Sequence, residues 1–407
     1  MKFNLKTLTA AVSCALLPTM AMAAQTTDEK LAQLEQQIKT LQTQQTANLT
    51  EKFNFNGFIS GAYISSDNDA GYDYAGSSAN FDQDSKFGLQ GAFQVNDSTQ
   101  AVMQLMMRGE DNWDPELEWA YLSHSFANGI QVRGGKLRLP LFMYSDYLDV
   151  GYAQPWARPP EEVYNGVPVS AYTGLDISYD LELADSTLTF QGFGGSSRVN
   201  ANADLKNSLG GNLSWTDETW TLRATYAQGT LEGKVTTQVN LSPDPSAPVY
   251  ADYTLIAFDD DKATFTGVGA SYDNGNYLVV GEWTRSEIDG LYPDTDSGYL
   301  TLGYRINDFT PYATLAYLAT QDDAQRTQDD AQRTIVDQQS AVLAAAFNAE
   351  RTSYSLGLRW DVMANIALKF DATYAHKFGD TSGRLPGNLG RSFDDTLVYT
   401  VKFDAVF

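Results

Sequence analysis

The last nine residues of the chain alternate between apolar and mostly polar side chains and end on an aromatic residue. Successive side chains of a strand point to opposite faces, so the odd-numbered positions from Tyr399 to Phe407 would share one apolar face. Thr400, Lys402 and Asp404 would share the opposite, polar face. A strand of a transmembrane β-barrel needs this pattern, because its outer face contacts lipid and its inner face contacts water. The final segment therefore predicts such a strand.

The same alternation recurs along the chain from Phe53 onward, in segments of about ten residues. We count about sixteen such segments and predict an all-β fold, a transmembrane antiparallel barrel over residues 51–407. The segments are 53–63, 87–95, 101–107, 117–121, 130–134, 175–181, 188–190, 209–215, 220–226, 265–272, 277–283, 300–306, 309–317, 354–360, 366–374 and 397–407.

The connections between these segments alternate in length. Short turns are expected at 96–97, 127–129, 217–218, 274–276, 307–308 and 364–365, where turn-forming residues cluster. Long polar loops are expected at 67–84, 136–172, 227–261, 320–350 and 379–394. Short turns at one end and long loops at the other are typical of an outer-membrane barrel, whereas a β-sandwich has no reason to keep them. An even strand count would place both ends of the barrel on the periplasmic side.

The first residues read as a secretory signal peptide over 1–23. Lys2 and Lys6 precede an apolar run over 8–20, and Ala21-Met22-Ala23 supplies the small-residue cleavage pattern. The run is too short to span a bilayer as a helix. A lipidated Cys14 is the alternative, although Ala11 stands where that signal prefers Leu. Removal of the signal peptide would leave no cysteine, and therefore no disulfide.

Residues 24–50 have a different period from the remainder. Leu31, Leu34, Ile38 and Leu41 recur at spacings of three and four, which is a heptad seam. So short a helix is marginal alone, and we expect a periplasmic coiled coil that joins copies of the barrel. A solvated tether is the alternative.

Charge and hydropathy exclude several classes. The formal net charge is −24, which argues against nucleic acid as a partner because that role needs clustered basic residues. There is no run of eighteen apolar residues, and the mean hydropathy is −0.32, so a helical membrane protein is excluded. A barrel is compatible with these values, because its lumen-facing side chains are polar.

One loop differs from the others. The segment 136–172 opens with Gly135-Lys136-Leu137-Arg138-Leu139-Pro140 and is rich in aromatic residues and prolines. A long apolar connection usually packs against another part of the protein, and proline limits its freedom.

The terminal Phe407, the alternation of short and long connections, and this Gly-Lys-x-x-x-Pro opening resemble the Gram-negative outer-membrane porins, in particular the phosphate- and dicarboxylate-type porins. The resemblance implies a homotrimer in the cell outer membrane, surrounded by lipid and lipopolysaccharide. It also implies that the third external loop folds into the lumen, and that Phe407 is an assembly signal read by the barrel-assembly machinery.

Charged side chains on the expected loop and strands would then line the pore. Lys136, Arg138 and Arg158 can supply a basic side, and Asp146, Asp149, Glu161 and Glu162 an acidic side. Strand parity adds lumen-facing Arg133, Arg223, Arg305, Arg359 and Lys369. Together these residues predict a waist that prefers small anions. The alternative is that each one pairs with a neighbouring Asp or Glu.

No catalytic constellation is visible. The chain has two histidines, His124 and His376, and neither belongs to a G-x-S-x-G or H-E-x-x-H motif. Residues 67–69 and 293–296 lack the spacing of a calcium loop. We therefore expect no enzyme activity, no cofactor and no metal.

The predicted function is passive diffusion of small hydrophilic solutes, and the alternative is a surface receptor or adhesin barrel without an open pore.

Overall fold

The computed structural model describes residues 36, 52–240, 250–290, 292–321, 347–390 and 392–407. The predicted signal peptide and coiled-coil segment lie outside these residues, apart from Gln36, which is helical. Residues Asn54–Phe407 form one compact unit.

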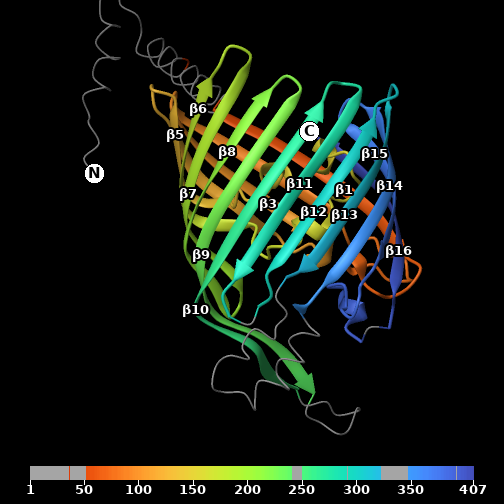
Figure 1. Ribbon diagram of the computed structural model, residues 1–407. Helices are drawn as coiled ribbons and strands as arrows, with labels where there is room; N and C mark the ends of the chain where they lie inside the picture. Colours follow the sequence, from red (N-terminus) through yellow and green to blue (C-terminus); the bar gives the residue numbers. More distant parts are fainter. Residues whose placement is uncertain (1–35, 37–51, 241–249, 291, 322–346, 391) are drawn as a thin grey trace, which may run out of the picture. The chain divides into compact units, whose positions relative to one another are not determined.

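Within the described residues, sixteen antiparallel strands close into a barrel, as the sequence predicted (Figure 1). Each strand pairs with its neighbours along the chain, and β16 closes the circle by pairing with β1 from Phe58↔Val406 to Ser66↔Val398. Closure removes the unpaired backbone edge that an open sheet would expose. The strands are β1 (Phe53–Ser66), β2 (Lys86–Asn96), β3 (Thr99–Arg108), β4 (Glu116–Ser125), β5 (Ile130–Arg138), β6 (Ala171–Glu182), β7 (Ser186–Asn200), β8 (Ala203–Asp217), β9 (Trp220–Asn240), β10 (Tyr250–Asp273), β11 (Tyr277–Ile288), β12 (Thr295–Tyr304), β13 (Phe309–Thr320), β14 (Glu350–Met363), β15 (Ile366–His376) and β16 (Asp395–Val406).

The two faces of the wall differ as the alternation predicted. On β16, Val401 and Phe403 are exposed on the outer face, whereas Lys402 and Asp404 are buried on the inner face. Large apolar side chains are exposed on the outer face of the other strands as well, and Leu356 of β14 reaches 69% exposure. Apolar surface of this extent is unfavourable in water, so the outer wall needs an apolar surrounding.

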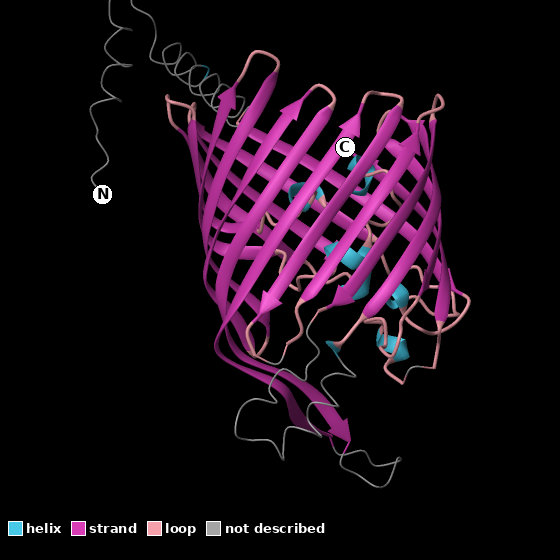
Figure 2. Ribbon diagram, viewed as in Figure 1, coloured by secondary structure: helices cyan, strands magenta, loops and turns pink. Residues whose placement is uncertain are grey.

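Two connections differ from the predicted pattern. The predicted loop 227–261 is wrong, because β9 and β10 continue through most of it as a long hairpin that projects beyond the barrel (Figure 2). β-branched and aromatic residues such as Thr230 and Phe258 suit this extended pairing. The connection between β7 and β8 lies at the long-loop end but comprises only residues 201–202.

The helical elements of the described residues are short and follow the strands at the loop end. No helix in the described part of the chain is long and apolar enough to cross a membrane. The elements are η1 (Tyr72–Tyr74), η2 (Gly109–Asp111), η3 (Ser145–Tyr147), η4 (Gly151–Ala153), α3 (Glu161–Tyr164) and η6 (Pro386–Asn388).

The difference between the two faces of the wall predicts that one added charge destabilises the barrel more on the outer face than on the inner face. Leu356→Arg should lower the free energy of unfolding of the vesicle-embedded protein by about 2–4 kcal/mol, because the guanidinium would face hydrocarbon. Gln100→Arg on the inner face of β3 should change it by much less. Denaturant titration of the vesicle-embedded protein measures both, and equal losses would contradict the assignment of the faces.

Candidate functional site inside the barrel

Residues 139–170, here called the inner loop, connect β5 to β6 and lie inside the barrel. Figure 2 shows their short helices within the ring of strands. The loop begins three residues later than the sequence suggested, because β5 continues through Arg138. Its apolar residues are buried against the inner wall: Phe142 lies 5.3 Å from Phe265, and Trp156 lies 5.6 Å from Tyr299, between ring centroids. This packing accounts for its aromatic composition.

Cations of the wall bind the backbone of the inner loop. A loop inside a lumen has few backbone partners of its own, so its carbonyl groups need donors from elsewhere. Four wall side chains supply them, each with a charged donor. The hydrogen bonds are Arg223 Nη2 to Pro140 O (2.8 Å), Lys369 Nζ to Gly151 O (2.6 Å), Arg359 Nη1 to Tyr152 O (2.7 Å) and Gln154 O (2.8 Å), and Lys402 Nζ to Ala157 O (3.0 Å).

Asp149 connects the inner loop to the wall strands β2, β3 and β5. Its carboxylate lies 3.1 Å from Lys86 Nζ, 3.3 Å from Arg108 Nη2 and 2.5 Å from Arg138 Nη1. Glu118 of β4 pairs with the same two arginines. Burial raises the pKa of the Asp149 carboxyl, but the charges of Lys86, Arg138 and Arg108 outweigh it, and the pKa lies well below its usual range. The carboxylate therefore stays ionised and paired at neutral pH.

A second charged cluster joins the inner loop to the external loop 67–85. Arg158 Nε lies 2.6 Å from Asp73 and 3.0 Å from Asp84, and Arg158 Nη2 donates a hydrogen bond to Thr400 Oγ1 at 2.8 Å. Burial alone would raise the pKa of the Asp84 carboxyl. The positive charges of Arg158, Lys402 and Lys86 outweigh burial and lower this pKa to about 2. Asp84 therefore stays ionised at neutral pH and holds the external loop against Arg158 of the inner loop.

Helix α3 of the inner loop is fixed by a buried arginine of β14. Arg351 Nε donates a 2.8 Å hydrogen bond to Glu162, and Arg351 Nη2 lies 3.6 Å from Glu161. The Arg351 guanidinium also lies 4.8 Å from the ring centroid of Tyr72, in the external loop. Glu162 is fully buried, so it supports the loop and is not available to a solute.

A cavity of about 430 Å³ opens above these contacts on the loop side of the barrel. Its lining combines acidic and basic side chains from the external loop, β2, β3, η2 and the inner loop, among them Asp73, Lys86, Arg108, Glu110 and Glu161. Asp149 also lines this cavity, so its contact with Lys86 and Arg108 borders the open space.

The predicted lumen residues take several positions. Arg133 faces the lumen and pairs with Asp176 at 2.5 Å, while Arg305 pairs with Asp273 beside a turn. Arg223, Arg359 and Lys369 also face inward, as parity predicted, but they hold the inner loop.

Lys136 is placed elsewhere. It pairs in register with Ala120 and Thr173, which share the outer face, and its Nζ donates a 2.5 Å hydrogen bond to Leu117 O. This register places Lys136 outside the lumen, whereas Arg138, at the end of β5, contacts Asp149 of the inner loop.

Phe407 joins the two ends of the barrel sequence. Its amide donates to Gly57 O at 2.9 Å, and Gly57 N donates to Phe407 O at 2.8 Å. Its ring lies 6.4 Å from that of Phe87 on the outer face.

Sequence reasoning missed several residues of this site. Lys86, Arg108, Arg351 and Lys402 all contact the inner loop, yet none was among the expected pore residues. The alternation of side chains along a strand could have found such residues. Lys402, for example, lies on the polar face of the last strand, which is the face predicted to line the lumen. In the part of the chain that the structure describes, no group of three His, Cys, Asp or Glu residues could hold a metal ion.

Comparisons with known proteins agree on the fold. No family model matches, and no curated protein matches by sequence. Among solved structures, a loop L8 deletion mutant of OmpT, an outer membrane protein of Vibrio cholerae, is 13% identical, with 87% of this chain and 99% of that chain covered and a TM-score of 0.56. Salmonella typhi OmpF (10% identity, 86% and 97% covered) has a TM-score of 0.54, and an anion-selective porin from Comamonas acidovorans (14% identity, 87% and 99% covered) has one of 0.52. These likenesses show that the chain shares its fold with these proteins.

The anchoring of the inner loop predicts a selective effect of Arg359→Ala. Its loss would leave the carbonyls of Tyr152 and Gln154 without a charged donor, at about 1.5–3 kcal/mol for each such hydrogen bond. We expect faster protease cleavage within 139–170 and noisier single-channel currents. Arg305→Ala removes the same charge far from the inner loop and should change neither. Equal cleavage of the two variants would contradict the anchoring role.

Proposed function

We propose that this chain is a porin of the cell outer membrane, through which small hydrophilic solutes diffuse passively. The observation that carries this proposal is the closed barrel with an apolar outer wall, a polar inner wall and an inner loop that narrows the lumen. The apolar wall suits insertion in a bilayer, and the polar lumen suits passage of solutes that water can dissolve. The proposal assigns no catalytic role.

The charges of the waist support weak selectivity. Arg138 and Arg158 were expected to form a basic side, yet each contacts two carboxylates. Because these charges are paired, they leave little net field at the waist. We therefore expect the preference for small anions to be slight. The similar barrel from Comamonas acidovorans is described as an anion-selective porin, which accords with this preference.

We further propose a homotrimer, embedded in outer-membrane lipid and lipopolysaccharide and inserted by the barrel-assembly machinery through Phe407. One neighbour, the OmpT of Vibrio cholerae folded in vitro, is described in its trimer form (12% identity, TM-score 0.53). The exposed aromatic end of β16 is available for recognition before the barrel closes, because Phe407 is 64% exposed even afterwards.

A second candidate is a surface receptor whose barrel is closed by its own loops. The observation in its favour is the direct contact of Asp149 with the wall, together with the closure of the external loop over Arg158. A receptor of this kind would need no open path.

Planar-bilayer recording separates the two candidates. The purified protein should insert with triplet conductance steps and give a reversal potential slightly biased toward anions in a salt gradient. Insertion without conductance would favour the closed receptor and contradict the porin proposal.

Asp149→Asn should raise the single-channel conductance, because it breaks the contact between the inner loop and Lys86, Arg108 and Arg138. One charge about 10 Å from an ion in water is worth about 0.4 kcal/mol, or about a twofold change in local ion concentration. The reversal potential should therefore also move toward anions.

Asp146→Asn is the matched control, since Asp146 is exposed on the same loop. It should move the reversal potential in the same direction without raising the conductance. Equal conductance of the two variants would show that the Asp149 contact does not narrow the path.

A further inference from the structure

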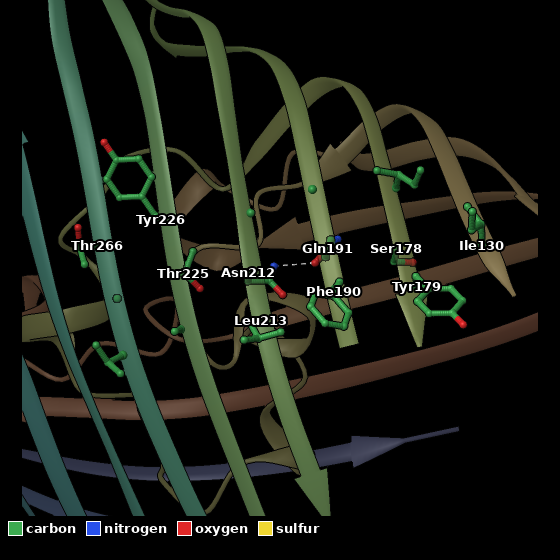
Figure 3. Close-up of a pocket in the computed structure, with 16 residues that line it drawn as sticks. Ile130, Ser178, Tyr179, Phe190, Gln191, Asn212, Leu213, Thr225, Tyr226 and Thr266 are labelled. Atoms are coloured by element: carbon green, nitrogen blue, oxygen red, sulfur yellow. Dashed lines mark hydrogen bonds between the residues drawn. The ribbon is translucent and has the colours of Figure 1, made fainter. Parts of the chain in front are cut away.

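The cavity of about 430 Å³ on the loop side of the barrel, here called the external cavity, differs in its charge from the hollows of the outer wall. A groove of about 880 Å³ in the outer wall is lined by exposed Phe190 and Leu213, which Figure 3 labels. None of the described side chains that line this groove is charged. The external cavity is instead lined by acidic and basic side chains, so it can recognise a charged solute.

Several cations of the external cavity are already paired. Lys86 and Arg108 contact Asp149, and Arg158 contacts Asp73. Breaking an ion pair that is nearly buried leaves one charge uncompensated, so these pairs resist exchange for a solute. A charged solute therefore needs partners outside these pairs.

Arg384, in the external loop that follows β15, is one such partner. It lines the external cavity, and its Nη2 donates a 3.0 Å hydrogen bond to Thr295 Oγ1. Among the residues that the structure describes, no carboxylate forms an ion pair with Arg384. A guanidinium carries five N–H donors, and two of them can bind the two oxygens of one carboxylate. Arg384 can therefore bind the carboxylate of a solute.

The backbone around Arg384 is held in place on both sides. Arg384 has a φ of 57°, in the left-handed region that a residue with a side chain rarely adopts. The preceding Gly383 accepts a 3.0 Å hydrogen bond from Arg351 Nη1, and the following Leu385 is fully buried. A strained residue of this kind persists only where its surroundings fix it, and such residues cluster at functional sites. The strain therefore supports a binding role for Arg384.

Glu110 supplies the opposite charge to the same cavity. It lies in η2, directly after β3, and accepts a 3.0 Å hydrogen bond from Gln83 Nε2. No lysine or arginine in the described part of the chain forms an ion pair with it, and its side chain is exposed. A positively charged group of a solute can therefore reach this carboxylate.

Arg384 and Glu110 enter the external cavity from different sides of the barrel. Arg384 is bonded to Thr295, the first residue of β12, whereas Glu110 follows β3, and these two strands lie almost opposite one another in the ring. A sphere of the cavity's volume is about 9 Å across, and two or three residues of extended peptide span about 7–10 Å. The two free charges therefore suit the two ends of a short peptide.

The rest of the lining suits the body of a peptide. Tyr74 is 69% exposed, and Leu148, Pro159 and Pro386 add further apolar surface for side chains. The side chain of Asn165 adds an amide, which can both donate to and accept from peptide groups.

We propose that the external cavity binds dipeptides and tripeptides with free termini before they pass the waist. The terminal carboxylate would contact Arg384, and the terminal ammonium would contact Glu110. A solute with two carboxylates or two ammonium groups would place one charge beside a like charge. This inference rests on the proposed porin function and names a solute class for it.

Ligand-observed NMR titration of the detergent-solubilised full chain measures this binding, with the dipeptide dialanine as the probe. Arg384→Gln should weaken dialanine binding about tenfold, because it removes one charge-assisted contact. Arg198→Gln removes an external cation that is 81% exposed and does not line the cavity, and it should leave binding unchanged.

The acidic end has a matched pair of variants. Glu110→Gln should weaken dialanine binding about tenfold. Asp111→Asn makes the same change of charge at the next residue, which does not line the cavity, and it should leave binding unchanged.

Blocked probes separate recognition from a loss of loop structure. Dialanine amide lacks the terminal carboxylate, N-acetyl-dialanine lacks the terminal ammonium, and both should bind the native protein weakly. Arg384→Gln should abolish the difference between dialanine and its amide, and Glu110→Gln should abolish the difference between dialanine and N-acetyl-dialanine. A variant that lowered the binding of all three probes by the same factor would show a structural role and overturn the proposed contact.

Binding of succinate as tight as that of dialanine, or equal losses in the control variants, would also overturn the proposed site. Bilayer conductance of the native protein, recorded with and without dialanine, separates this inference from the porin proposal. A protein that conducts but does not bind dialanine refutes this inference alone. Binding without conductance refutes the porin proposal and supports the site as part of a closed receptor.

Discussion

The binding of inner-loop carbonyl groups by wall cations is the interaction on which the arrangement of the lumen depends. A segment of thirty-odd residues inside a barrel cannot satisfy its backbone by regular pairing, and unpaired buried carbonyls cost free energy. Arg223, Arg359, Lys369 and Lys402 project inward from four strands and donate to carbonyls spread along the segment. Closure of the barrel is what brings these strands around the loop, so the constriction is a consequence of the fold.

The same cations explain why a lumen rich in arginine and lysine has little free positive charge. Several donate to carbonyls, and others, such as Arg138 and Arg158, contact carboxylates. The waist is therefore held by paired charges, which is consistent with slight selectivity and with passage governed by size.

The barrel, its strand number and the inward direction of Arg223, Arg359 and Lys369 could be predicted from sequence, because alternation reports which face a side chain occupies. What each inward side chain contacts could not be predicted, since Gly151 and Lys369 are brought together only by the path of the inner loop. Lys136 was assigned to the lumen as part of the expected loop 136–172, but β5 continues through Arg138 and its register places Lys136 on the outer face. The hairpin of β9 and β10 was taken for a loop because its polar residues obscure its extended pairing.

Hydrogen–deuterium exchange of the vesicle-embedded protein tests the central claim, that the inner loop is fixed to the wall, most directly. Amides of residues 139–170 that are hydrogen-bonded or buried should exchange as slowly as those of β12 and β13, because they open only when the wall contacts break. Exchange of the whole segment within seconds, at the rate of an exposed loop, would contradict a constriction held by the wall cations.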